Sequence, residues 1–323
     1  MQCSRLLVVG RRSRQGSGRP PRSTASLPVE ARDAPPRPAV GWALAALLML
    51  VAAGAVAWMI SGGRGADGGG AGGGPGLTHV HGLGINPKDG ALYIATHTGL
   101  FRAAKGQTKA TRVGESEQDV MGFSVMGPNR FLGSGHPGAL QSGPANLGLI
   151  RSDDGGESWD SVSLLGESDF HVLRSEEPMV YGFDASSSRF LVSADGGRNW
   201  EERDTPGEML DLAIDPSDSS RVVASTERGL VASGDRARSW RVLHDGPLAL
   251  LTWVRPKALY RVDGAGRVAR SADAGQSWEQ MGSVKAQPAA FASAGSDLYI
   301  ALPDGTVKRS VDDGKTWTTR ATA

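Results

Sequence analysis

Five of the six histidines lie within one stretch of the chain, between residues 79 and 171. They are His79, His81, His97, His136 and His171. Imidazole is the commonest metal ligand in proteins, and a carboxylate that hydrogen-bonds one ring nitrogen orients the other toward the ion. Carboxylates accompany these histidines at Asp119, Asp169 and Asp184. These residue types are suited to binding a divalent transition metal, provided that the fold brings them together.

A repeat with a period near 40 residues supplies such a fold. The pattern is Ser-x-Asp-x-Gly-x-(Ser/Thr/Asn)-Trp, with Ala237 in place of the glycine in one copy. Its tryptophans are separated by 41, 40, 38 and 39 residues: Trp159, Trp200, Trp240, Trp278 and Trp317. Short apolar runs bounded by Gly, Asp and Pro lie between the copies, as strands and hairpin turns require. This period with four strands per unit predicts a β-propeller.

The repeat divides residues 77–323 into six blades of an all-β propeller. Leu77–Gly114 forms a first blade whose turn motif has decayed, and Glu115–Leu165 forms a second with an inserted loop at Pro137–Asn146. An irregular segment that hides a seventh blade is the alternative. The motif itself is a turn device, because its Ser and Asp side chains bond backbone N–H groups and its glycine supplies a positive φ. Its tryptophan is expected to pack between neighbouring blades.

Superposition of the blades predicts where the histidines lie. Aligned first strands share one position at His81, Met121 and His171, and another, two residues earlier, at His79, Asp119, Asp169 and Glu208. Aligned second strands share the position of His97, His136, Asp184, Glu227 and Asp263. Since first strands line the channel of a propeller and second strands end near its mouth, these positions are expected to converge around the axis.

The predicted site is therefore a metal site at the axial mouth, for copper or zinc. Its residues are His81, His97, His136 and His171, supported by Asp119, Asp169 and Asp184. A soft ligand at Met121 would favour copper. Histidines that only bond backbone carbonyls or channel water are the alternative, and a register slip of one residue would turn them outward.

The first 76 residues differ in composition from the repeats. Residues 1–40 hold eight arginines and only two acidic residues, which predicts a disordered basic tail. Residues 41–60 carry no charge and are long enough for a transmembrane signal-anchor helix, and residues 61–76 form a glycine-rich linker. The positive-inside rule puts the tail in the cytoplasm and the propeller on the extracytoplasmic side of a bacterial cell membrane. A cleaved signal peptide is the alternative.

The overall charge excludes some partners. Lysine plus arginine (35) nearly balance aspartate plus glutamate (34), so no nucleic-acid partner is expected. The only cysteine is Cys3, in the predicted cytoplasmic tail, so the exported part has no disulfides.

The repeated turn resembles the Asp-box (BNR) repeat of sialidases and other secreted propellers. Three segments are also similar to bacterial membrane-anchored propellers labelled glycosyl hydrolases: HVHGL (His79–Leu83), SGHPG (Ser134–Gly138) and GESDFH (Gly166–His171). The resemblance implies the propeller fold and, by its label, glycoside hydrolysis. The Arg-Ile-Pro segment of sialidases has no counterpart, and Tyr93, Tyr260 and Tyr299 share one second-strand position, which indicates packing.

The expected function is thus binding of a metal ion or small polar ligand at the mouth. Hydrolysis of extracellular glycans and assembly of membrane complexes are the alternatives.

Overall fold

The computed structural model describes residues 77–322, except Thr78, Ser116 and Leu140. The predicted tail (1–40), signal-anchor helix (41–60) and linker (61–76) lie outside the described residues. Within the described part of the chain, no helix is long and apolar enough to span a membrane.

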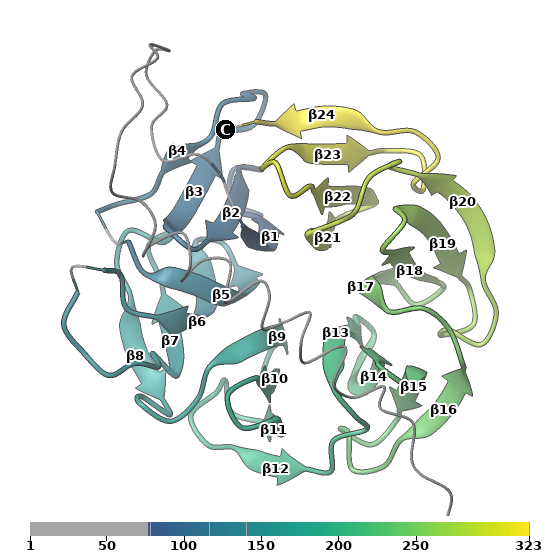
Figure 1. Cartoon of the computed structure of the whole chain (residues 1–323), viewed down its shortest axis with the longest axis horizontal. Coiled ribbons are helices and arrows are strands. Elements are labelled where there is room, and N and C mark those ends of the chain that lie inside the picture. The colour runs from purple at the N-terminus through teal and green to yellow at the C-terminus, as the bar shows by residue number, and fades with distance from the viewer. Residues whose placement is uncertain (1–76, 78, 116, 140, 323) are drawn as a thin grey trace, which may run out of the picture. The chain divides into compact units, whose positions relative to one another are not determined.

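Six antiparallel sheets of four strands each are arranged in a ring (Figure 1). Blade one contains β1 (Val80–Ile85), β2 (Leu92–Thr96), β3 (Gly99–Ala103) and β4 (Thr111–Arg112). Blade two contains β5 (Asp119–Gly127), β6 (Arg130–His136), β7 (Leu149–Ser152) and β8 (Asp160–Ser163). Blade three contains β9 (Phe170–Glu176), β10 (Met179–Asp184), β11 (Arg189–Ser193) and β12 (Glu201–Arg203).

Blade four contains β13 (Met209–Asp215), β14 (Asp218–Thr226), β15 (Gly229–Ser233) and β16 (Arg241–His244). Blade five contains β17 (Ala249–Arg255), β18 (Ala258–Asp263), β19 (Arg267–Ser271) and β20 (Glu279–Ser283). Blade six contains β21 (Ala290–Ala294), β22 (Asp297–Ala301), β23 (Val307–Ser310) and β24 (Thr318–Ala321). The prediction of an all-β, six-bladed propeller is confirmed, and the described residues hold no seventh blade.

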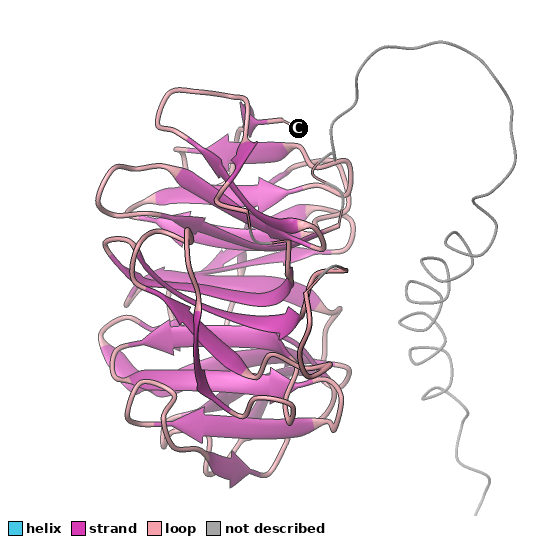
Figure 2. Ribbon diagram, turned by 90° about the vertical axis from the view of Figure 1, so that its left-hand side faces the viewer, coloured by secondary structure: helices cyan, strands magenta, loops and turns pink. Residues whose placement is uncertain are grey.

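The first strand of every blade lies innermost, around the centre of the ring (Figure 1). The blades are stacked side by side around the ring (Figure 2), and apolar clusters between adjacent blades cover the middle strands. Every residue of β2 and β10 is accordingly buried, whereas the outer strands β8, β12 and β16 are largely exposed. This explains why the middle strands appear in the sequence as continuous apolar runs and the outer strands do not.

The tryptophans of the repeated motif belong to the apolar clusters between blades. Trp159 of blade two packs with Tyr93 and Leu100 of blade one, and with Phe131 of its own blade. The rings of Tyr93 and Phe131 lie 4.7 Å apart. All four tyrosines are buried, so the packing role predicted for Tyr93, Tyr260 and Tyr299 is confirmed.

The repeated turns have one hydrogen-bond pattern, and blade five illustrates it. Ser271 Oγ accepts the Gly275 N–H at 2.7 Å and donates to Asp273 Oδ1 at 2.8 Å. Asp273 in turn accepts the N–H and the hydroxyl of Ser277. Blades two, three, four and six repeat these bonds. Ala237, which replaces the glycine in blade four, holds φ at 60° and keeps the bond to its serine.

Candidate metal site at the channel mouth

A β-bulge at the start of the innermost strand recurs in the first four blades. Val80 pairs with Thr96 and Gly82 with Ala95, which leaves His81 as the extra residue. The corresponding extra residues in blades two, three and four are Met121, His171 and Leu210. A bulge re-aims a side chain locally, and all four residues line the central channel. The first-strand alignment predicted from the sequence is therefore correct.

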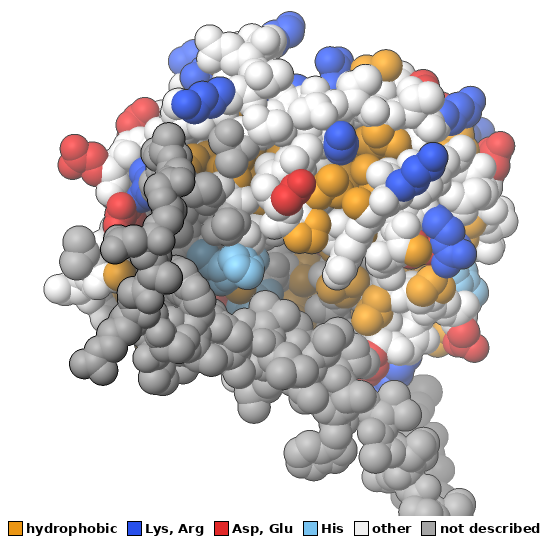
Figure 3. Space-filling view, turned by 45° about the horizontal axis from the view of Figure 1, so that its top comes forward, with side chains coloured by type: hydrophobic (Ala, Val, Ile, Leu, Met, Phe, Trp, Pro, Cys, Tyr) orange, Lys and Arg blue, Asp and Glu red, His pale blue; other side chains and the backbone are white. Residues whose placement is uncertain are grey.

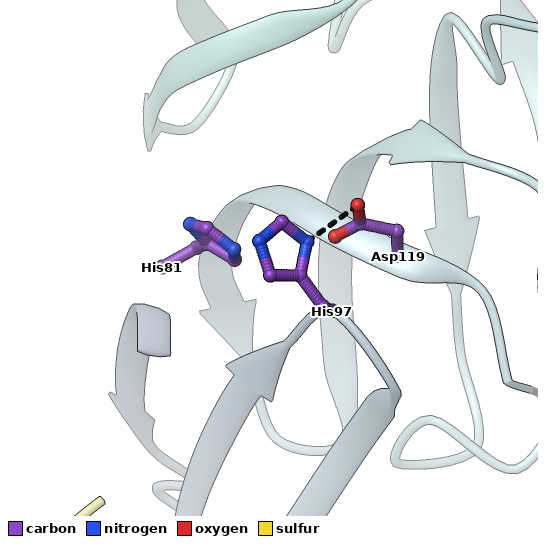
Figure 4. Close-up of side chains that lie close together, drawn as sticks. All are labelled: His81, His97 and Asp119. Atoms are coloured by element: carbon purple, nitrogen blue, oxygen red, sulfur yellow. Dashed lines mark hydrogen bonds and ion pairs between the residues drawn. The ribbon is translucent and has the colours of Figure 1, made fainter. Parts of the chain in front are cut away.

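His81, His97 and Asp119 come together at this mouth (Figure 4). Each offers one ligand atom, and these atoms lie within 4.8 Å of one another. The Nδ1 atom of His97 is 2.6 Å from Asp119 Oδ2, and the His81 ring lies edge-on to the His97 ring at 4.3 Å. Because a carboxylate accepts and does not donate, His97 carries its proton on Nδ1, and its Nε2 is left with a lone pair.

Two buried atoms of this group have no hydrogen-bond partner in the described structure: His81 Nε2 and Asp119 Oδ1. Burial, and then the neighbouring His97, lower the pKa of His81 to about 4. His81 is consequently neutral at physiological pH, with a lone pair on the ring. Buried polar atoms without partners are rare, and a bound ion is one of their ordinary explanations.

A second group lies beside the first, where Asp169 accepts from two imidazoles. Its Oδ2 is 2.8 Å from His171 Nε2 and 3.3 Å from His136 Nε2. The other nitrogen of His136 donates to the Ala145 carbonyl at 2.9 Å. Since both neighbours of His136 are acceptors, the ring carries two protons, and the hydrogen bond to Asp169 raises its pKa to about 9. Burial opposes ionisation of Asp169, but the bonds from His136 and His171 hold the pKa of Asp169 well below its usual value.

His136 cannot act as a metal ligand in this protonation state. A ring with a proton on each nitrogen has no lone pair for an ion, so His136 would first have to release the Ala145 carbonyl. In the described structure the residue instead ties the inserted loop of blade two to Asp169. His171 differs, because only its Nε2 has a partner and its ring lines the channel.

Asp184 does not occupy the position predicted for it. Asp184 pairs with Phe170, just as Thr96 pairs with Val80. It therefore lies at the position of Thr96, one residue before the position that His97 and His136 share. The same correction applies to Asp263, which pairs with Ala249. The Asp184 side chain is fully buried and accepts from Ser186, Ser187, Arg189 and the Asp169 N–H. It therefore stabilises a turn and supports Asp169 through the backbone.

His79 shares its first-strand position with Asp119 and Asp169, but it is not one of the predicted ligands. His79 is exposed at the mouth with φ at 57°, and its ring lies 5.1 Å from that of His97. Histidine surface is visible beside the central hollow in Figure 3. The hollow continues as a channel of about 690 Å³ lined by the innermost strands. Its lining includes small hydroxyl and apolar side chains, with His81 and His171 at one end.

The fold defines the chain as a protein of the six-bladed β-propeller class. Among solved structures, a GH74 enzyme of Niastella koreensis is similar, with a TM-score of 0.55 at 15% identity. The match covers 76% of this chain and 45% of that one, so this chain spans less than half of the enzyme. A structure of a nidogen/laminin complex gives a TM-score of 0.54 at 16% identity, over 72% of this chain and 93% of that one.

YCF48 from Cyanidioschyzon merolae has a TM-score of 0.49 at 16% identity, over 76% of this chain and 86% of that one. No protein-family model matches the sequence, and comparison with curated proteins finds no match. At these identities the structural likeness establishes the propeller fold alone.

Proposed function

We propose that this propeller binds a transition-metal ion, copper or zinc, at its channel mouth. The ligands are His81, His97 and Asp119. The observation that carries the proposal is the shielded Nε2 of His81, which has no partner and lies beside a second imidazole fixed by a carboxylate. Imidazole with a carboxylate suits copper and zinc, whereas calcium and magnesium prefer sites built from oxygen ligands.

The roles of the three residues differ. His97 presents Nε2 because Asp119 holds its Nδ1, which is the common arrangement for metal-binding histidines. Asp119 also has a second oxygen, Oδ1, that is buried without a partner and is available to an ion. His81 needs no deprotonation, since its pKa of about 4 leaves the ring neutral. A metal that binds to His81 therefore does not have to displace a proton from this ring above that pH.

The proposal includes the location predicted from the sequence. With residues 41–60 as a signal-anchor, the propeller lies on the extracytoplasmic side of a bacterial membrane, where its site meets ions outside the cytoplasm. We also assign the repeated turns to the Asp-box class of sialidase-like propellers. The support is the serine and aspartate hydrogen bonding that recurs in five blades, from Ser152 to Thr316.

Elemental analysis of the full chain tests the proposal. The protein is purified in detergent without a histidine tag and dialysed against a weak chelator, and about one copper or zinc ion per chain is expected to remain. The double variant His81→Ala/His97→Ala is expected to lose it. His244→Ala is the matched control, because His244 lies on β16 and contacts Asp245 and Arg261 instead of the mouth. Equal metal content in the double variant and the wild type would contradict the proposal.

Glycoside hydrolysis remains the alternative implied by the resemblance. Hydrolysis requires two carboxyl groups flanking the sugar bond. The carboxylates that line the channel in the described residues are Glu176 and Asp211. Asp211 is buried and already accepts from Arg174 and from two backbone N–H groups. Turnover of a fluorogenic glycoside that is lost in Glu176→Gln would favour the enzyme. A membrane partner that still co-purifies with the double histidine variant would favour the scaffold.

A further inference from the structure

We infer that the site at the channel mouth selects copper(I) over zinc(II), and that Met121 is the residue that determines this selectivity. The inference rests on the proposed function: for copper(I), the thioether sulfur of Met121 takes the place of Asp119 as the ligand beside His81 and His97. The inference concerns which ion the site prefers, and the experiment distinguishes this preference from metal binding itself.

Met121 occupies the same bulge position in blade two that His81 occupies in blade one and His171 in blade three. The three innermost strands are neighbours in the ring, and all three side chains line the channel. A side chain from the blade between His81 and His171 therefore borders the same channel, and the inferred site brings its sulfur to His81.

Apolar packing does not account for Met121. Met179 and Met209 belong to the hydrophobic cluster between blades three and four, and Met126 packs against the cluster between blades two and three. Met121 is in none of the apolar clusters of the described residues and is only partly buried. Met121 therefore presents its side chain to the channel, as Leu210 does at the same bulge in blade four, and its thioether sulfur is what sets it apart.

The backbone holds Met121 firmly in this position. A Cβ on Gly135 would lie 2.0 Å from the Asp119 carbonyl oxygen and 3.0 Å from the Met121 nitrogen. A Cβ on Gly122 would lie 2.4 Å from the Phe170 carbonyl oxygen in the next blade. Both glycines thus allow the bulge to pack closely against its neighbours. The sulfur is consequently delivered from a fixed bulge and not from a mobile loop.

The chemistry of the ligands then favours copper(I). Thioether sulfur is a soft ligand that selects copper(I), and imidazole suits both copper and zinc. His81 and His97 are neutral donors, so together with Met121 they form an uncharged set of two nitrogens and one sulfur. Zinc(II) is rarely coordinated by a thioether and binds a carboxylate or water instead. Met121 is therefore expected to matter for one ion and not for the other.

Competition titrations of the full chain in detergent test this inference. Copper(I) affinity is measured without oxygen against a chromophoric copper(I) chelator, and zinc(II) affinity against a zinc-binding dye. Every protein carries Cys3→Ser, because the only thiol of the chain would bind copper(I) by itself. Met121→Leu keeps the volume and removes the sulfur. It is expected to weaken copper(I) binding about tenfold or more and to leave zinc(II) binding unchanged.

Met126→Leu is the matched control, since Met126 also lines the channel but packs against the apolar cluster between blades two and three. It is expected to change neither affinity. Copper K-edge absorption gives a second readout: a sulfur neighbour is expected in the wild type and its loss in Met121→Leu.

Unchanged copper(I) affinity in Met121→Leu, or an equal loss of both ions, would overturn the role of Met121. If zinc(II) still binds through His81 and His97 in that case, the proposed function stands and only this inference fails. If the wild type retains neither ion, the proposed function fails as well.

Discussion

His81 shows how a single residue can be unfavourable for folding and useful for binding. Its shielded Nε2 has no hydrogen-bond partner, and an unsatisfied buried polar group costs about 1–3 kcal/mol. The equivalent bulge position in blade four holds Leu210, so the backbone there accepts an apolar residue. The imidazole therefore does not serve stability in the metal-free protein.

Replacement of His81 by leucine is accordingly expected to stabilise the metal-free protein while it abolishes metal binding. The gain comes from removing an unsatisfied buried nitrogen, and it is measured as a higher Tm in the presence of a strong chelator. His171→Leu is the control at the equivalent bulge, because it removes a donor to Asp169 and should lower the Tm. A lower Tm for His81→Leu in chelator would mean that the ring contributes to stability in its own right.

Asp119 is expected to control metal affinity through the tautomer of His97. Asp119→Asn replaces an acceptor with an amide that can also donate to Nδ1, which would move the ring proton to Nε2. Loss of a partner of this kind typically weakens metal binding about 10- to 100-fold. The measurement is a zinc(II) titration, with Asp153→Asn as the exposed control that pairs only with Arg151. Full zinc affinity in Asp119→Asn would show that His97 does not need its carboxylate.

At the level of the element, the repeated turn combines a local network with an interblade contact. Burial of the tryptophan depends on the turn, because the bonds from Ser271 and Asp273 set the backbone that positions Trp278 against blade four. The hydroxyl of Ser277 is the chief cause that lowers the pKa of Asp273 to about 2. Asp154 and Asp312 have the same low pKa from the same contact.

The lowered pKa of Asp273 makes the stabilising effect of the turn depend on pH. A carboxyl group whose pKa is depressed in the folded state contributes stability above its unfolded value of about 3.8 and loses it as the pH falls toward 2. Asp273→Asn is therefore expected to lower the free energy of unfolding at pH 6, and the difference from wild type should shrink as the pH approaches 2. Urea unfolding at both pH values measures it. A difference that stays constant with pH would mean that the charge is unimportant.

The blade elements were largely predictable from the sequence, and the exceptions are local. The period of the repeat predicted six blades of four strands, with the first in Leu77–Gly114 and the second in Glu115–Leu165, and the structure has them there. Asp184 was misplaced by one residue in the superposition of the second strands, because it pairs with Phe170 as Thr96 pairs with Val80, and the residue types alone do not fix this register. The bulges of the first strands aim His81 and His171 at the channel. Hydrogen-bond partners such as the Ala145 carbonyl, which fixes His136 in its charged form, leave no signal in the sequence.

At the level of the propeller, buried polar contacts join the innermost strands of neighbouring blades. Asp211 of blade four is fully buried, and burial raises its pKa even though Arg174 of blade three lies beside it. Its other oxygen accepts the Leu251 N–H of blade five at 2.8 Å. One carboxylate thus holds three successive innermost strands around the channel. Such a contact keeps the ring circular only if the first and last blades also meet.

The last blade meets the first without exchanging a strand. Each sheet is built from consecutive strands, so the two blades meet through an apolar cluster that includes Val80, Leu83 and Tyr299 and through the end of β24. The Thr322 N–H donates to the Thr108 carbonyl at 2.9 Å, and Lys109 and Thr322 form an isolated bridge. Arg320 donates to the carbonyls of Gln107, Ala103 and Ala104. Blade one, which carries His81 and His97, is therefore held on one side by blade two and on the other by this contact.

Arg320→Ala is expected to destabilise the propeller by weakening this closure. The variant removes three hydrogen bonds from a half-buried guanidinium to carbonyls of blade one, an effect of about 1–3 kcal/mol on the free energy of unfolding. Arg241→Ala removes an exposed arginine of β16 and should stay within about 0.5 kcal/mol. Urea unfolding compares the two variants.

Because closure orders blade one, hydrogen exchange in β1 and β2 should rise in Arg320→Ala before exchange in β13 does. A uniform rise would show that the ring opens as a whole.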